Sequence, residues 1–281
     1  MIPTGSNNAV RLALFAVVFF AGTVLSQPVQ LQIRPHIGDT LRMHLSQTVE
    51  ITGTTRGRSD PVRLMTSSIE VFTRAIPQRW TSNGTLMQTI TDSVAMNPAS
   101  PASLADLRRR AMQAKRVLLR VSPDGAMELV DDGDSNSELR HLFGEMPAVL
   151  SRNTVSVGEK WTREMTIPLS NEPGAVGAVR ATFQFDSLGR NGDIAYISMR
   201  GTMYRINTPN AAPAGPGYGT TGQLAGTIQI DRRLGWITDS KSSIIVRSTV
   251  TPPPARSGEA ERAPMDVRTK ITQWTRAMRA R

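Results

Sequence analysis

The stretch from Ser187 to Ser243 constrains the fold most, because almost all of it has the pattern of β-strands and tight turns. Apolar and polar residues alternate from Ile194 to Met199, and Asn191-Gly192 is a typical hairpin turn. A period of two residues places one face of a strand against a core and the other in solvent. The stretch therefore predicts successive antiparallel strands.

The same pattern covers most of the chain. Leu41 to Ile51 alternates, two further strands are predicted around Asn83-Gly84, and Met265 to Met278 is predicted to be one last strand. No regular succession of strand, helix and strand occurs, which favours antiparallel over parallel pairing.

Two short helices are predicted near the middle of the chain. Leu104 to Lys115 has helical spacing after a capping residue, Ser103. Glu138 to Ser151 has helical spacing that Gly144 and Pro147 limit to one or two turns. The predicted fold class is therefore α+β and β-dominated, with two short helices between two β-rich halves.

Three turn motifs recur in the same order and suggest two related β repeats. Gly38-Asp39 matches Gly158-Glu159, Asn83-Gly84 matches Asn191-Gly192, and the turn at Gly125 matches the turn at Gly235. The alternative interpretation is that any antiparallel protein places glycine turns at similar spacing.

The N-terminus is typical of a secretory signal peptide. Arg11 precedes an apolar run from Leu12 to Val24, and Ser26 suits a cleavage site. An uncleaved N-terminal anchor is the alternative, and no later segment is apolar enough to cross a membrane. The mature protein is expected to be periplasmic or extracellular. The predicted organisation is a signal peptide (1–26), a first β-rich half with short helices (27–151), a second β-rich half (152–250), a disordered linker (251–264), and a C-terminal strand with a basic tail (265–281).

The formal net charge is +10, from 33 basic and 23 acidic residues. Such a charge attracts anionic surfaces, but a solvated arginine-rich surface that reflects compositional bias is the simpler explanation. No motif for specific nucleic-acid recognition accompanies it. The chain has no cysteine, which excludes disulfides and thiolate metal sites.

No catalytic, cofactor-binding or metal-binding residue is assigned. The three histidines, His36, His44 and His141, lack metal-ligand spacing, and GxSxG and phosphate-binding loop motifs are missing from the sequence. The acidic run Asp131 to Glu138 has oxygen ligands at alternate positions, which suits Ca²⁺, but a helix start accounts for it too.

Carboxylates and tryptophans are the other candidates. A hydrolase would need two carboxylates facing each other across a cleft, and the tryptophans can either pack in the core or form a stacking platform. The candidates are Asp92, Asp186, Asp193, Asp239, Trp161 and Trp236.

Three segments carry a resemblance to a family: GDTLRMHLSQTVEI, VSVGEKWTREMTIPL and GTIQIDRRLGWITDSKS. The chain resembles a family of uncharacterised exported bacterial β-rich proteins. Their layout is similar to periplasmic lipoprotein-carrier-type curved sheets, whose concave face holds acyl chains. The resemblance implies curved antiparallel sheets and carries over no catalytic residue.

The leading hypothesis is an exported, non-enzymatic envelope protein that binds a hydrophobic or amphipathic ligand, such as a lipid, on a curved antiparallel sheet. The second is a structural or interaction protein that contacts an anionic envelope polymer. The third is a carboxylate-dependent hydrolase.

Overall fold

One antiparallel sheet contains nearly all of the regular structure. A computed structural model describes residues 27–55, 60–97, 116–131, 145–168, 176–206, 220–250 and 263–278. These ranges form a twelve-stranded sheet and one 3-10 turn, η1 (Arg190–Gly192). The strands are β1 (Leu41–Thr55), β2 (Val62–Thr81), β3 (Gly84–Asn97), β4 (Arg116–Val121), β5 (Met127–Asp131), β6 (Glu145–Met146), β7 (Lys160–Pro168), β8 (Val176–Gly189), β9 (Ile194–Ile206), β10 (Thr220–Asp231), β11 (Trp236–Val250) and β12 (Met265–Met278).

The sheet consists of two six-stranded meanders laid side by side. The strand order is β6-β5-β4-β3-β2-β1-β12-β11-β10-β9-β8-β7, and every neighbouring pair is antiparallel. The meanders β1–β6 and β7–β12 join where β1 pairs with β12, from Arg42↔Met278 to Thr55↔Met265. The β-dominated, antiparallel part of the predicted fold class is confirmed.

The prediction of two short helices is not confirmed. Leu104 to Lys115 lies outside the described residues, and so does the first part of the predicted helix at Glu138 to Ser151. Its second part is wrong, because Glu145–Met146 is strand β6 and residues 147–151 are irregular, with a bend at Leu150. Pro147 has no N–H for a helical hydrogen bond, while Met127↔Met146 pairing adds the segment to the sheet edge.

The two meanders place their turns and irregularities at matching positions. All six positive-φ glycines of the described ranges lie at the predicted matching turns: Gly38, Gly84 and Gly125 in the first meander, Gly158, Gly192 and Gly235 in the second. Bulges also match, at Pro77/Arg79 between β2 and β3 and at Phe185/Ser187 between β8 and β9. Gly38 N–H donates to Pro77 O and Gly158 N–H to Phe185 O, so the hydrogen bonds repeat as well.

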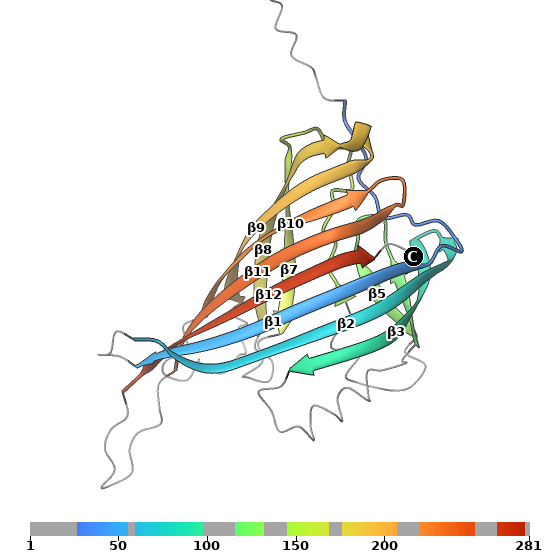
Figure 1. Cartoon of the computed structure of the whole chain (residues 1–281). Helices are drawn as coiled ribbons and strands as arrows, with labels where there is room; N and C mark the ends of the chain where they lie inside the picture. Colours follow the sequence, from blue (N-terminus) through green and yellow to red (C-terminus); the bar gives the residue numbers. More distant parts are fainter. Residues whose placement is uncertain are drawn as a thin grey trace, which may run out of the picture.

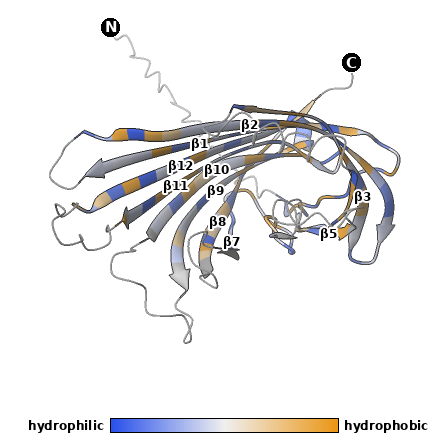
Figure 2. Ribbon diagram, turned by 90° about the horizontal axis from the view of Figure 1, so that it is seen from below, coloured by the Kyte–Doolittle hydropathy of each residue, from blue (hydrophilic) through white to orange (hydrophobic). Residues whose placement is uncertain are grey.

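The sheet is strongly curved, as Figure 2 shows from below, where it forms an arch. One buried cluster contains Leu41 of β1, Val121 of β4, Phe183 of β8 and Ile230 of β10. These strands are far apart in the sheet order, so their side chains meet only if the sheet curls with this face inside. We call this face the concave face and the opposite one the convex face.

An extended segment, residues 27–40, closes one end of the curved sheet. We call this end of the sheet the hairpin end. It contains the turns between β2 and β3, β4 and β5, β8 and β9, and β10 and β11 (Figure 1). Ile33 N–H donates to Pro123 O at 2.8 Å, and Arg34 N–H donates to Gly235 O at 2.9 Å. Leu31 and Ile33 are 1% and 2% exposed. The segment therefore connects turns of both meanders and buries apolar side chains between them.

Gly235 provides a test of this closure. A Cβ at Gly235 would lie 2.2 Å from Arg34 O, whereas one at Gly158 would meet nothing within 4 Å, and both residues have positive φ. We expect Gly158→Ala to lower the free energy of unfolding by about 1 kcal/mol, from backbone conformation alone. Gly235→Ala should cost about 3 kcal/mol because it also displaces the segment. Urea unfolding of the two variants measures the difference, and equal losses would contradict a tight contact at Arg34.

Candidate functional site

The concave face is built from rows of side chains that run across the strands. Strand register aligns one residue from each strand, and alternation points all of them to the same face. The row we call the Ile271 row contains, from β7 to β2, Arg163, Ala181, Gly201, Leu224, Ile244, Ile271, Val49 and Ser67. The next row, the Val246 row, contains Val179, Met203, Gly222, Val246, Thr269, Ile51 and Met65.

These rows change from buried to half-buried across the sheet. Ala181 is fully buried and Val179 is 8% exposed, since both belong to the core at the β8 side. Ile244, Ile271 and Val49 are only half-buried, although they are as apolar as the core residues. Apolar surface thus continues out of the core along the concave face of β10, β11, β12 and β1.

Methionines lie against glycines on this face. A Cβ at Gly222 would lie 2.8 Å from the Met203 Cε atom, and one at Gly226 would lie 2.4 Å from the Met199 Cε atom. Because Gly222 and Gly226 have no side chains, the two methionine side chains can occupy the space beside them. Methionine is flexible and polarisable, so such a surface adapts to apolar partners of different shape.

A charged cluster closes the concave face at the hairpin end. The Asp124 carboxylate is 8% exposed, accepts hydrogen bonds from the Ser122 hydroxyl and from Arg152 Nε at 2.9 Å, and lies 3.8 Å from Arg163 Nη2. Arg163 Nη2 also donates to Leu150 O. The cluster connects the β4–β5 turn to the segment that enters β7.

Asp124 should make stability depend on pH. Burial raises the pKa of Asp124, but the hydrogen bonds from Ser122 and Arg152 outweigh burial and hold this pKa below its usual value of 3.8. The carboxylate therefore contributes stability above about pH 4 and loses that contribution as the pH falls through the lowered pKa.

We expect Asp124→Asn to lower the free energy of unfolding by about 2 kcal/mol at pH 7 and by less at pH 3. Urea unfolding at the two pH values measures this. The control Asp186→Asn, at an exposed carboxylate that accepts from Ser198, should change stability by less than about 0.5 kcal/mol. A loss for Asp124→Asn that is independent of pH would contradict the assignment.

The convex face is polar and carries a groove over β8 to β11. A cavity of about 480 Å³ has Arg180 and Arg200 on its lining, with threonine and serine hydroxyls and the small residues Gly201 and Ala225. Arg180 pairs with Glu164 at 3.3 Å, whereas within the described ranges no acid pairs with Arg200. Hydrogen bonds from Tyr204 and Arg180 lower the pKa of Glu164, which keeps this carboxylate ionised.

A second feature of the convex face is an aromatic cluster around Trp274. Arg276 and Lys241 lie over its ring at 4.3 and 5.4 Å from the centroid, and its Nε1 donates to Asp239 at 3.2 Å. His44 stacks on Phe72 with ring centroids 4.3 Å apart. Sequence patterns did not single out Trp274, because its neighbours come from separate strands.

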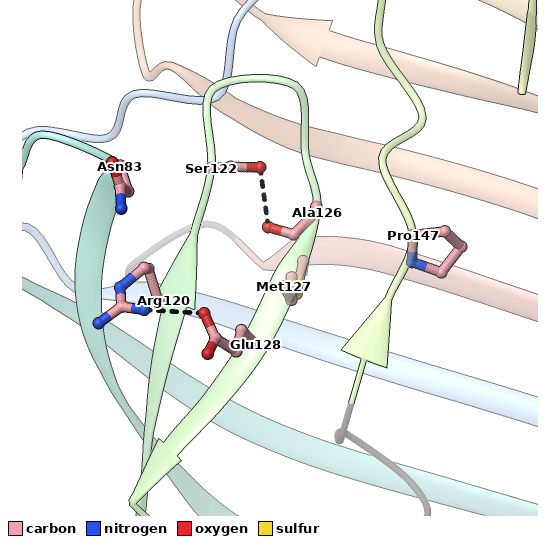
Figure 3. A pocket seen from close by; sticks show the side chains of 7 residues that line it. All are labelled: Asn83, Arg120, Ser122, Ala126, Met127, Glu128 and Pro147. Carbon is pink, nitrogen blue, oxygen red and sulfur yellow. Dashed lines mark hydrogen bonds and ion pairs between the residues drawn. The ribbon is translucent and has the colours of Figure 1, made fainter. Parts of the chain in front are cut away.

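Another small cavity, of about 350 Å³, lies beside the β4–β5 hairpin (Figure 3). Arg120 Nη1 and Glu128 Oε2 form an ion pair at 2.8 Å there, and the Ser122 hydroxyl oxygen lies 3.2 Å from Ala126 O. Arg120 and Glu128, the charged residues that line it, thus neutralise each other, and we assign no function to this cavity.

The carboxylates named as hydrolase candidates do not come together. Asp92 pairs with Arg74 at 2.8 Å on the convex face of β2 and β3, and Asp239 pairs with Arg276 at 3.2 Å on β11 and β12. Asp186 accepts from Ser198, and Asp193 lies 3.8 Å from Arg233. Each has its own partner, so no pair is arranged across a cleft.

The other candidate residues have structural surroundings. Trp161 stacks on Phe183 and donates to Val149 O, and Trp236 is 7% exposed with its Nε1 3.3 Å from Met43 Sδ. Both tryptophans therefore pack in the core. His36 lies 3.7 Å from Asp39.

The proposed calcium ligands from residues 132–138, and His141, lie outside the described residues. Within the described ranges, no three histidine or acidic side chains gather closely enough to hold a metal ion. The same ranges contain no helix that is long and apolar enough to cross a membrane.

Comparison with known proteins gives little. No family model matches the chain, and no curated protein matches it. Among solved structures, the chain is similar to an outer membrane channel from Pseudomonas putida F1, at 10% identity and a TM-score of 0.21, over 89% of this chain and 99% of that one. A likeness at this TM-score supports no conclusion about function. The resemblance to exported bacterial proteins and the expected export therefore remain predictions from sequence.

Proposed function

We propose that this protein is a non-enzymatic component of the cell envelope that binds a hydrophobic or amphipathic ligand on its concave face. The observation that carries the proposal is the half-buried apolar surface formed by Leu224, Ile244, Ile271 and Val49. Full burial of such a side chain stabilises by about 1.5–3 kcal/mol, so an apolar occupant would gain part of that energy at each position.

The shape of the sheet supports an elongated ligand. The Ile271 row crosses β10, β11, β12 and β1 without a charged side chain, and neighbouring strands are about 4.8 Å apart. Those four strands span roughly 15 Å, which accommodates most of an extended acyl chain. The proposed architecture is two copies of one β repeat, which the matching turns and bulges of the meanders support.

Two measurements test the proposal. Native mass spectrometry of protein purified from its own host should detect a co-purifying lipid or other small amphiphile. Purified and delipidated protein should bind 11-(dansylamino)undecanoic acid saturably, with fluorescence enhancement that palmitate reverses. If no adduct is detected and the probe does not bind, the proposal is wrong.

A second candidate function is contact with an anionic envelope polymer through the convex groove. Arg180 and Arg200 on the groove lining, together with hydroxyl groups, suit carboxylate or phosphate groups of such a polymer. Alginate, used as the probe, should bind the wild type and lose about tenfold in affinity in the double variant R180S/R200S. The controls are unchanged binding of the dansylated fatty acid to that variant and unchanged alginate binding to R79S. Equal alginate binding to the wild type and R180S/R200S would exclude the groove.

A further inference from the structure

The ends of β1, β2, β11 and β12 opposite the hairpin end form a projecting tip. Thr55 pairs with Met265, which pairs with Val250, so the four strand ends lie together. Figures 1 and 2 both show these ends extending beyond the rest of the sheet. With 15 residues in β1 at about 3.3 Å each, the tip lies roughly 50 Å from the hairpin end.

Exposed apolar side chains occur at this tip. Val62 is 61% exposed and Leu64 is 49% exposed, on either side of Arg63 at the start of β2. The Leu64 side chain reaches toward the place where Gly53 lacks a Cβ, since a Cβ there would be 2.8 Å from Leu64 Cδ1 and 2.7 Å from Met265 Sδ. The glycine thus allows Leu64 and Met265 to approach each other at the edge of the tip.

Three arginines lie in one row across the convex side of the tip. Arg247 and Arg268 are direct cross-strand partners, and Arg268 and Arg63 both pair with Thr52 between them. All three arginines are exposed. Like charges directly opposite each other on neighbouring strands destabilise a sheet, so an anionic partner that neutralises Arg247 and Arg268 would remove this repulsion.

Within the described ranges, the nearby acidic residues do not neutralise the positive charge of these three arginines. Asp266 accepts a hydrogen bond from the Thr249 hydroxyl at 2.8 Å, Glu50 lies 3.9 Å from Lys270, and Asp60 is exposed at the start of β2. Among the described residues, none of them forms an ion pair with Arg63, Arg247 or Arg268.

We propose that this tip docks the protein on an anionic lipid bilayer. Exposed valine and leucine side chains would enter the boundary between headgroups and acyl chains, while the arginines would contact lipid phosphates. A soluble polyanion would use the arginines but gain nothing from Val62 and Leu64, so the combination favours a membrane surface.

Vesicle flotation tests the proposal with full-length mature protein. Vesicles of phosphatidylethanolamine with 30% phosphatidylglycerol are compared with vesicles of phosphatidylcholine alone. We expect binding to the anionic vesicles that weakens as salt is raised from 50 to 500 mM, and little binding to neutral vesicles.

Two double variants, each with a matched control, separate the contribution of the arginines from that of the exposed apolar side chains. R247S/R268S should lower the partition coefficient roughly 25-fold, at about fivefold for each arginine near the surface. The charge-matched control R42S/R79S, with both changes near the hairpin end, should stay within about twofold. V62S/L64S should lower it about tenfold, and its control I37S/L234S, at exposed apolar residues of the hairpin end, should not.

Three outcomes would overturn the proposal: no flotation with anionic vesicles, equal flotation with neutral vesicles, or equal losses in the tip variants and their controls. A loss in R247S/R268S with none in V62S/L64S would also overturn it, because the exposed apolar side chains would then take no part in docking. Binding of the dansylated fatty acid is measured separately on the same variants. Failure of bilayer docking is therefore distinguishable from failure of ligand binding.

Discussion

We expect Ile33→Asp to lower the free energy of unfolding by about 4 kcal/mol, which is a large share of the total for a typical domain. Ile33 is 2% exposed and belongs to the main buried cluster, and its backbone N–H already donates to Pro123 O. The substitution buries a carboxylate with no described partner and leaves the backbone contact in place. Thermal and urea unfolding by circular dichroism would measure the loss.

Gln32→Asp is the matched control. Gln32 is exposed on the same extended segment, one residue away, so the same new charge would face solvent. Its effect should remain within about 0.5 kcal/mol. Equal and small effects of both substitutions would show that residues 27–40 do not hold the hairpin end together.

The turns of this fold could be predicted because they depend on local backbone conformation. Gly84, Gly125, Gly192 and Gly235 all have positive φ at the places where a turn was predicted. The strands followed from a period of two, and Met265 to Met278 is strand β12 as its alternation predicted. Short-range patterns were sufficient for both kinds of element.

Pairing between distant parts of the chain could not be predicted in the same way. Nothing in the local sequence indicates that Leu45 lies opposite Thr275, since any two alternating strands of this length are compatible. The same limit applies to Ile33, whose place between two hairpin turns depends on contacts with Pro123 and its neighbours. The helix at Glu138 to Ser151 was predicted from spacing alone, while strand pairing at Met146 determines the observed structure.

In the candidate site too, local sequence predicted some features, whereas others depend on contacts between distant parts of the chain. Alternation indicated that Ile271 faces an apolar side, but its half-buried state depends on what the curved sheet leaves uncovered. Trp161 and Trp236 were considered as stacking platforms and pack in the core instead. Trp274, which no pattern singled out, has two cations over its ring, and these partners, Lys241 and Arg276, are contributed by β11 and β12.

The second large effect is expected at Ile271. We predict that Ile271→Lys raises the dissociation constant for 11-(dansylamino)undecanoic acid about thirtyfold or more, because an ammonium group would then lie in the middle of the apolar row against an acyl chain. The residue is half-buried, with Ile244 and Val49 as its cross-strand partners, so the ammonium group can reach solvent when no ligand is bound. The fold should therefore survive, with a loss of about 1–2 kcal/mol in the free energy of unfolding.

Thr272→Lys separates the two faces of the same strand. Thr272 is the next residue of β12, is exposed, and faces the convex side, so the variant has the same added charge on the same element. Its dissociation constant for the probe should stay within about twofold of the wild-type value. If both lysine variants weaken probe binding equally, the ligand is not on the concave face. If neither does while the wild type binds, the ligand site lies away from the Ile271 row. Only a loss confined to Ile271→Lys assigns binding to this row, because the two variants differ in the face of the sheet and in little else.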